Sequence, residues 1–307
     1  MDWVLFATQL LNGFQLGILL FLLAAGLTLV FGIMDLVNLA HGSLYMMGAF
    51  FCASFTHWTG SFVIGVALAL PATLLLGIVV EVVVLRTLYE RDHLDQVLAT
   101  FGLILFFDTL VQMVWGPEGR AIPLPASLNT AVDLGAGILF PTYRMLIIVV
   151  GLAVAGGLYL LVGHTRLGML IRAGASNRTM AGALGVDIKL LFTLVFGLGA
   201  TLAGLAGMMV APITAATIGM GDDILIVAFV VIVIGGIGSI RGAFIAAVLV
   251  GLMDTMGRSF LEDLFVLFMS RQAADTSAPA LSAMLIYILM AAILFLRPQG
   301  LFPPRGR

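Results

Sequence analysis

Long stretches without any charged side chain are the feature that most restricts how this chain can fold. Three of them are Trp3–Met34, Met145–Gly163 and Leu190–Gly221. Each reaches or exceeds the roughly 17–25 residues that cross the hydrocarbon core of a bilayer. Within that core the backbone must be hydrogen-bonded inside the protein, and continuous rather than alternating apolar runs favour helices over a β-barrel. We therefore predict an all-α, polytopic transmembrane protein.

The composition supports the same conclusion. Hydrophobic residues make up 62% of the 307 residues and charged ones only 10%, against about 25% charged in soluble proteins. The formal net charge of −2 identifies no partner, and no basic block indicates nucleic acid. Because Cys52 is the single cysteine, an internal disulfide is excluded. We assign no catalytic residue and no metal site.

The hydropathy pattern predicts about eight to ten crossings, depending on whether the opening stretch forms a broken or re-entrant helix. The candidate spans are about 9–31, 37–56, 62–85, 96–115, 143–163, 190–212, 223–240, 242–257 and 280–296. A cytoplasmic carboxyl terminus places most of the 14 Lys and Arg residues in inner loops: Arg86, Arg91, Arg166, Arg172, Arg178, Lys189, Arg241, Arg297, Arg305 and Arg307. Only Arg120, Arg144, Arg258 and Arg271 remain outside. The positive-inside rule therefore predicts this orientation, with an extracytoplasmic amino terminus.

No linker divides the chain, so residues 1–307 are expected to form one transmembrane domain. Two outer loops are predicted. Residues 116–142 are rich in Pro and Gly and could meet an external partner, and residues 258–279 read as an amphipathic segment followed by a polar link. The only sizeable inner loop is 164–189.

Polar side chains interrupt the apolar sequence at "FGIMDLVNLAHGS", which contains Asp35, Asn38, His41 and Ser43. A charged group at mid-membrane depth costs roughly 2.5–3.5 kcal/mol on insertion scales, so it persists only beside a cavity or a partner. One interpretation is a helix end at the inner interface. The interpretation we favour is an unwound helix whose polar groups, Asn38 and His41 above all, line a translocation path or brace its gate.

A second interruption, "IGGIGSIRGAF", contains Gly235, Gly236 and Gly238. Glycine-broken segments in corresponding positions of two halves point to a transport pathway built from two structural repeats. We therefore expect broken helices in two pseudo-repeated halves, and we include these glycines in the pathway. Tight helix packing through small residues is the alternative.

The inner loop predicts one short amphipathic helix between the permissive residues Gly174 and Gly185. Its apolar residues are Met180, Ala183, Leu184 and Val186, and its polar ones are Arg172, Ser176, Asn177, Arg178 and Asp187. The apolar face of such a helix requires a docking partner, unless it rests on lipid.

Four stretches in this order resemble the permease subunits of branched-chain amino acid ABC importers, with the LivH type fitting best. They are "GLTLVFGIMDLVNLAHGSLYMMGAF", "RAGASNRTMAGALGV", "VIGGIGSIRGAFIAAVLVG" and "LRPQGLF". The resemblance implies that Arg172–Asp187, including Ala173 and Gly185, is the coupling helix that docks on a cytoplasmic ATPase. It also places Asn38–Gly42 in the membrane domain. Many members carry an acidic residue where this chain has Ser43.

The resemblance further implies two ABC ATP-binding subunits that hold ATP and Mg²⁺, a second homologous permease and a periplasmic amino-acid-binding protein. The location implied is the bacterial inner membrane, and the substrate leucine, isoleucine or valine. Related permeases move urea, short amides or other amino acids, which are the alternative substrates.

The residues themselves agree that this chain is not an ATPase. A Walker A motif needs a lysine after glycine, whereas the only lysine, Lys189, stands between Ile188 and Leu190. We therefore predict a translocator without an enzymatic site or a cofactor of its own.

Other classes are disfavoured. A secondary transporter would need coupling acids such as Glu81, Asp108 or Asp254, which are expected near span ends. An intramembrane aspartyl protease, suggested by "GMGD" at Gly219–Asp222, lacks a second acidic motif, so Asp222 and Asp223 are read as capping acids. A passive channel would leave the inner loop without a role.

Overall fold

The computed structural model describes residues 3–89, 91–135 and 137–302. Its helices are α1 (Trp3–Met34), α2 (His41–Thr59), α3 (Phe62–Val83), the 3-10 turn η1 (Leu85–Leu88), α4 (His93–Trp115), α5 (Thr142–His164), α6 (Arg166–Ser176), α7 (Arg178–Ala183), α8 (Ile188–Thr214), α9 (Met220–Gly235), α10 (Ile240–Val266) and α11 (Arg271–Leu296). The strands β1 (Ala131–Asp133) and β2 (Leu139–Pro141) form an antiparallel hairpin between α4 and α5. The predicted all-α polytopic fold is confirmed.

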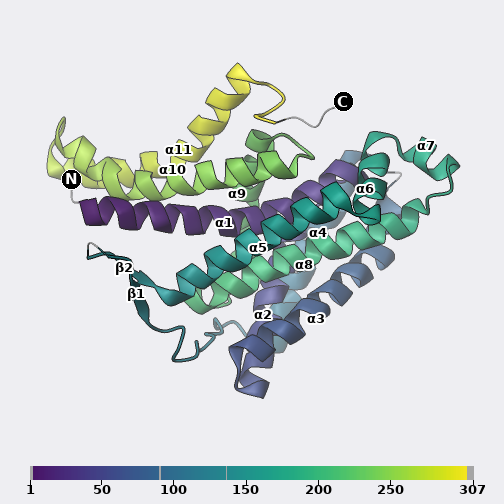
Figure 1. The fold of residues 1–307 in the computed structure, drawn as a ribbon, viewed down its shortest axis with the longest axis horizontal. Helices are drawn as coiled ribbons and strands as arrows, with labels where there is room; N and C mark the ends of the chain where they lie inside the picture. The colour runs from purple at the N-terminus through teal and green to yellow at the C-terminus, as the bar shows by residue number, and fades with distance from the viewer. Residues whose placement is uncertain (1–2, 90, 136, 303–307) are drawn as a thin grey trace.

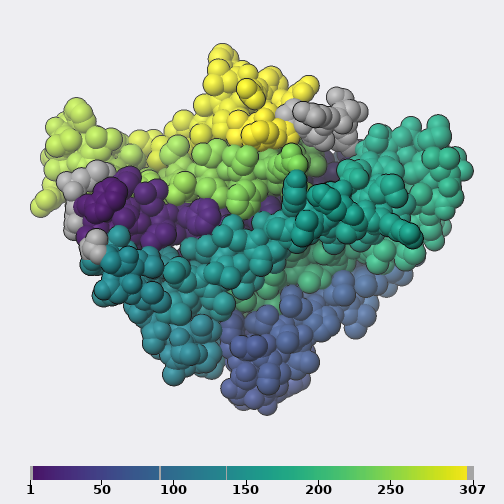
Figure 2. Space-filling view, in the orientation of Figure 1, coloured from purple at the N-terminus to yellow at the C-terminus, as the bar shows by residue number. Residues whose placement is uncertain are grey.

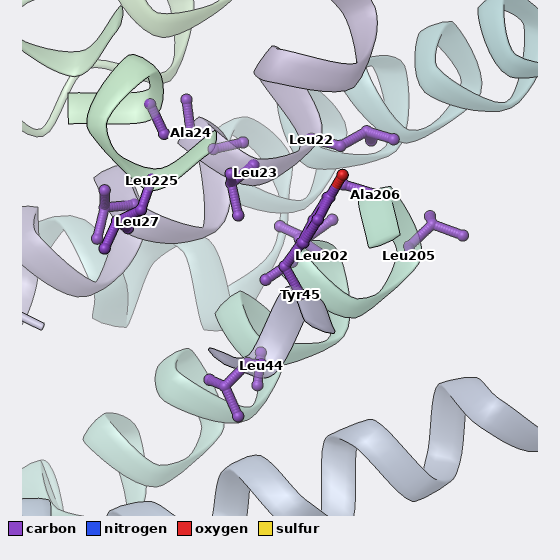
Figure 3. Packing of buried hydrophobic residues seen from close by; sticks show 14 of the residues in the cluster. Leu22, Leu23, Ala24, Leu27, Leu44, Tyr45, Leu202, Leu205, Ala206 and Leu225 are labelled. Atoms are coloured by element: carbon purple, nitrogen blue, oxygen red, sulfur yellow. The ribbon is translucent and has the colours of Figure 1, made fainter. Parts of the chain in front are cut away.

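Helix α1 is the centre of the bundle. It packs mainly against α10 and α8, and also against α5 and α9, so that in Figure 1 it runs between α10 on one side and α5 on the other. It is apolar all round, as a helix buried on every side must be. Figure 3 shows its residues Leu22, Leu23 and Leu27 in the core with Tyr45 of α2 and Leu202 of α8.

Glycines bring these central helices into backbone contact. A Cβ atom placed on Gly48 of α2 would lie 2.4 Å from the Cα of Gly204 in α8, and one on Gly26 of α1 would lie 2.6 Å from the Gly199 carbonyl oxygen. No side chain fits at such distances. Small residues thus allow the close packing on which helix association in lipid depends.

Among the described residues, seven helices are long and apolar enough to cross a bilayer: α1, α3, α4, α5, α8, α10 and α11. The predicted spans at 37–56 and 223–240 correspond to the shorter helices α2 and α9, of 19 and 16 residues. The beginning of α1 and the β1–β2 hairpin lie at one end of the molecule, whereas α6 and α7 lie at the other (Figure 1). Arg305 and Arg307 are outside the described residues.

The stretch 258–279, expected as an amphipathic segment followed by a polar link, is almost entirely helical. Helix α10 continues to Val266 and α11 already begins at Arg271, so only residues 267–270 connect them. An ion pair between Arg258 and Asp254, with 3.0 Å between nitrogen and oxygen, lies one helical turn apart and supports the extension of α10. The polar residues that suggested a loop are instead on exposed helical turns.

We predict opposite effects for two glycine substitutions. Gly48→Ala should lower the thermal unfolding midpoint in detergent, because overpacking against the α8 backbone costs about 1–3 kcal/mol. Gly102→Ala in α4, where an added Cβ meets nothing within 4 Å, should leave the midpoint unchanged or raise it, since alanine favours a helix. The measurement is fluorescence-detected size exclusion after heating. Equal shifts in both variants would contradict the assigned α2–α8 contact.

Candidate functional site: the break between α1 and α2 and the α6–α7 segment

The connection from α1 to α2 turns back into the bundle. Asp35 has a φ of 53°, a left-handed conformation that Asp tolerates better than most residues. At the start of α2, His41 Nε2 lies 3.2 Å from the carbonyl oxygen of Leu23. Leu23 is about 16 Å from the end of α1 at a rise of 1.5 Å per residue. Residues 35–40 therefore run back along α1, and α2 begins deep inside the protein.

This break buries polar groups without satisfying them. Asn38 and His41 are fully buried and Ser43 is 1% exposed. Within the described part of the chain, both amide atoms of Asn38, the Nδ1 of His41 and the hydroxyl of Ser43 have no hydrogen-bond partner. An unsatisfied buried polar group costs about 1–3 kcal/mol, and native proteins contain few of them. The unpartnered groups need water, a ligand or a different conformation to be satisfied.

Thr28 of α1 joins this set and was missed in the sequence. It is 1% exposed, and its hydroxyl has no partner among the described residues. A threonine in a helix ordinarily bonds the carbonyl one turn earlier, so its sequence context gave no signal. We call Thr28, Asn38, His41 and Ser43 the buried polar set.

The first turn of α9 meets the first turn of α2. A Cβ atom on Gly42 would lie 2.4 Å from the carbonyl oxygen of Gly221. Two helix N-termini, each carrying a partial positive charge, thus meet inside the protein. The "GMGD" sequence is part of this contact. Gly219 is the cap of α9, while Asp222 and Asp223 lie in its first turn rather than at the cap as predicted.

The glycines of the second break occupy another place. Gly236 and Gly238 have φ values of 100° and 85°, and a Cβ atom on Gly32 of α1 would lie 2.9 Å from the Cα of Gly238. Residues after α11 pack against this break, where Leu301 N–H donates a hydrogen bond to the Ile234 carbonyl oxygen at 2.8 Å. The second break therefore packs on the last turns of α1, away from the contact between His41 and Leu23.

The inner loop forms two helices, not the single one predicted. Gly174 lies inside α6, buried beside Leu191, and the boundary falls at Asn177. The Asn177 side chain accepts a hydrogen bond from Met180 N–H at 2.9 Å and caps α7. The sequence suggested Gly174 as the boundary because glycine often lies at helix ends. In the structure the boundary is set by the Asn177 side chain, which caps α7. Gly185, with a φ of 90°, ends the turn after α7 as expected.

Apolar side chains of α7 and the turn after it are exposed. Met180 is 58% and Leu184 79% exposed, and Ala183 is also exposed, whereas Val186 is half-buried. Figure 2 shows this part of the chain projecting at one end of the molecule. The remaining predicted residues of this segment are in place around it: Arg172, Ala173 and Ser176 in α6, Arg178 at the start of α7, and Asp187 as the cap of α8.

An ion pair connects this segment to the first break. Arg178 Nη2 lies 3.9 Å from Asp35 Oδ2, with side chains 41% and 45% exposed. At that exposure the pair contributes little, typically below about 1 kcal/mol. Asp35 therefore lies at the surface beside α7, apart from the buried polar set.

Two of the three acids considered for ion coupling are held by local partners. Glu81 accepts hydrogen bonds from Arg86, Tyr89 and Thr193, and Asp254 is paired with Arg258.

Comparison with known proteins agrees with these features. Residues 9–294 match the family described as the branched-chain amino acid transport system permease component. The high-affinity branched-chain amino acid transport system permease protein BraD of Pseudomonas aeruginosa is 29% identical, covering 95% of this chain and 94% of its own. The LivH permease proteins of Salmonella typhimurium and Escherichia coli K12 are 26% and 27% identical, each covering 95% of this chain and 96% of their own. No solved structure matches. Because the match spans nearly all of the sequence, this multi-pass membrane protein belongs to the branched-chain amino acid transport permease family.

Proposed function

We propose that this chain is the permease subunit of an ATP-driven importer that moves leucine, isoleucine or valine across a bacterial inner membrane. The exposed apolar side chains of Met180 on the short capped helix α7 and of Leu184 just after it carry the proposal, because an exposed apolar surface of this kind is typical of a docking site for a partner protein. The names of the relatives support the substrate. Urea, short amides and other amino acids remain the alternative cargoes.

Membership of the permease family supports a set of partners. Two ATP-binding subunits would hold ATP and Mg²⁺, and one of them would dock on α7. A second homologous permease would complete the membrane part, and a binding protein would deliver substrate to the outer face. This chain itself needs no ATP site, since its only lysine is not part of a phosphate-binding loop.

We place α6, α7 and the carboxyl-terminal end in the cytoplasm, with the amino terminus and the β1–β2 hairpin in the periplasm. Arg172 in α6 and Arg178 in α7 support this orientation, because cations gather on the cytoplasmic side and these helices lie at the opposite end from the hairpin in Figure 1.

ATP binding and hydrolysis would bias an outward-open and an inward-open state through different contacts at α7. The buried polar set would act where these states differ. Thr28, Asn38, His41 and Ser43 are shut away from solvent in this conformation, so opening beside the α1–α2 break would expose them to water or substrate. The glycines at 235, 236 and 238 would give the second break its freedom to move.

Purification from native membranes tests the assembly. We expect two ATP-binding subunits and a second permease to remain bound, and the reconstituted complex to take up amino acid only with ATP. A chain that purifies alone and transports without ATP would support a secondary transporter instead.

A charge on the exposed face of α7 should abolish coupling. In Leu184→Asp, burying a carboxylate under the ATPase is costly, so we expect ATP-dependent uptake to fall at least about tenfold while the amount of folded protein is unchanged. Leu184→Met, which keeps an apolar side chain at the same exposed position, is the matched control and should transport normally. Normal uptake by Leu184→Asp would exclude α7 as the docking site.

Asn38→Leu should affect stability and transport differently. Removing an unsatisfied buried amide should keep the thermal midpoint equal or raise it, because the cost of burying that group disappears. Uptake should fall, since the polar group needed in the open state is lost. Measuring both quantities on one preparation checks this, and undiminished uptake would show that Asn38 serves neither the pathway nor its gate.

A further inference from the structure

A buried carboxylate sits near the end of α3. The Glu81 side chain is fully buried, and it accepts hydrogen bonds from Arg86 Nη2 at 3.2 Å, Tyr89 Oη at 2.6 Å and Thr193 Oγ1 at 2.7 Å. Burial and the hydrogen bond to Glu81 raise the pKa of the Tyr89 phenol, so it stays a donor at physiological pH. We call these four residues the Glu81 junction. Losing one donor would leave a charge poorly compensated inside the protein, which is strongly unfavourable.

The Glu81 junction ties η1 to the beginning of α8. Thr193 lies in the second turn of α8 and also accepts a hydrogen bond from Arg86 Nη2 at 2.9 Å. The neighbouring Phe192 packs edge-on against the Tyr89 ring, with 5.1 Å between ring centroids. Helix α8 begins directly after the α7 turn, at its cap Asp187. If α7 moves and shifts the start of α8, then η1 must move with it, or the contacts of Thr193 and Phe192 with η1 and its neighbours must break.

A second buried side chain ties η1 to the α1–α2 break. Gln96 of α4 is 4% exposed. Its Nε2 donates to the carbonyl oxygens of Leu88 and Arg91, each at 3.2 Å, and its Oε1 accepts from Val37 N–H at 3.4 Å. Val37 directly precedes Asn38 of the buried polar set. Specific, partly buried contacts thus lead from α8 to the break.

We propose that the Glu81 junction and Gln96 form the link that transmits movement of the α6–α7 segment to the α1–α2 break. Glu81, Thr193 and Gln96 are then positioning residues that need not touch substrate. The inference rests on the proposed function. The exposed Arg178–Asp35 pair is a poorer link, because water and salt screen it. The α1–α2 break is then the element that differs between the outward-open and inward-open states. Its buried polar groups lack partners among the described residues in the present conformation.

The test measures substrate imported per ATP hydrolysed by the complete transporter in proteoliposomes. Thr193→Val keeps the side-chain shape but loses the hydroxyl, Thr193→Ser restores it, and Gln96→Leu cuts the link at its other end. Thr109→Val is the matched control, since the exposed Thr109 bonds only its own helix. We expect Thr193→Val and Gln96→Leu to lower import per ATP at least about fivefold with little change in ATP hydrolysis, a modest size for coupling between sites.

The double variant Thr193→Val/Gln96→Leu should lose no more than the single variants, because both interrupt one link. Thr193→Ser and Thr109→Val should keep the wild-type ratio. An unchanged ratio in both single variants, or import and hydrolysis falling in parallel, overturns the inference. Wild-type protein without ATP-dependent uptake would overturn the proposed function instead. If Thr193→Val fails to fold, Gln96→Leu decides alone.

Discussion

Backbone contact at glycines between α1, α2 and α8 is the constraint on which the rest of this permease depends. In lipid, apolar side chains gain little by meeting each other rather than acyl chains, so helices associate through close packing and hydrogen bonds. Gly26 against Gly199 and Gly48 against Gly204 provide that close packing. With α1 held in the middle, α3, α4, α5 and α11 are left to face outward, and much of their apolar surface is exposed in the single chain.

The same tight centre explains how an unwound segment can exist inside a membrane protein. Irregular backbone at membrane depth is tolerated only where protein or a water-filled cavity surrounds it. The α1–α2 break meets this condition, because it leads into α2, which packs against α8 and α9, and because Asn38 is fully buried. Its buried and unpartnered side chains make this conformation less stable than an apolar core would be. Such a cost is expected where a protein must change between states.

The α6–α7 end of the bundle contrasts with that break. Here Asn177 and Asp187 cap helices, and Glu81 has three donor residues. A segment that receives force from a partner must be rigid to pass it on, and satisfied buried networks give such rigidity. The hydrogen-bonded Glu81 junction is thus linked to the α1–α2 break, whose buried polar groups lack partners within the described part of the chain. A transporter that is driven by a partner at one face needs such a rigid part connected to a part that can change conformation.

Much of this protein could be predicted from its sequence. Uncharged apolar runs determine an all-α membrane protein, because lipid permits little else, whereas the docking surface inferred for the segment before α8 stays a prediction. The true ends of α10 and α11 escaped prediction, since exposed amphipathic turns at a membrane boundary resemble loops. Only the tertiary structure decided that α2 begins beside Leu23, that Gly42 meets Gly221 and that Thr193 bonds Glu81. These contacts join residues far apart in the chain, and local pattern carries no information about which distant surfaces a packed helix will meet.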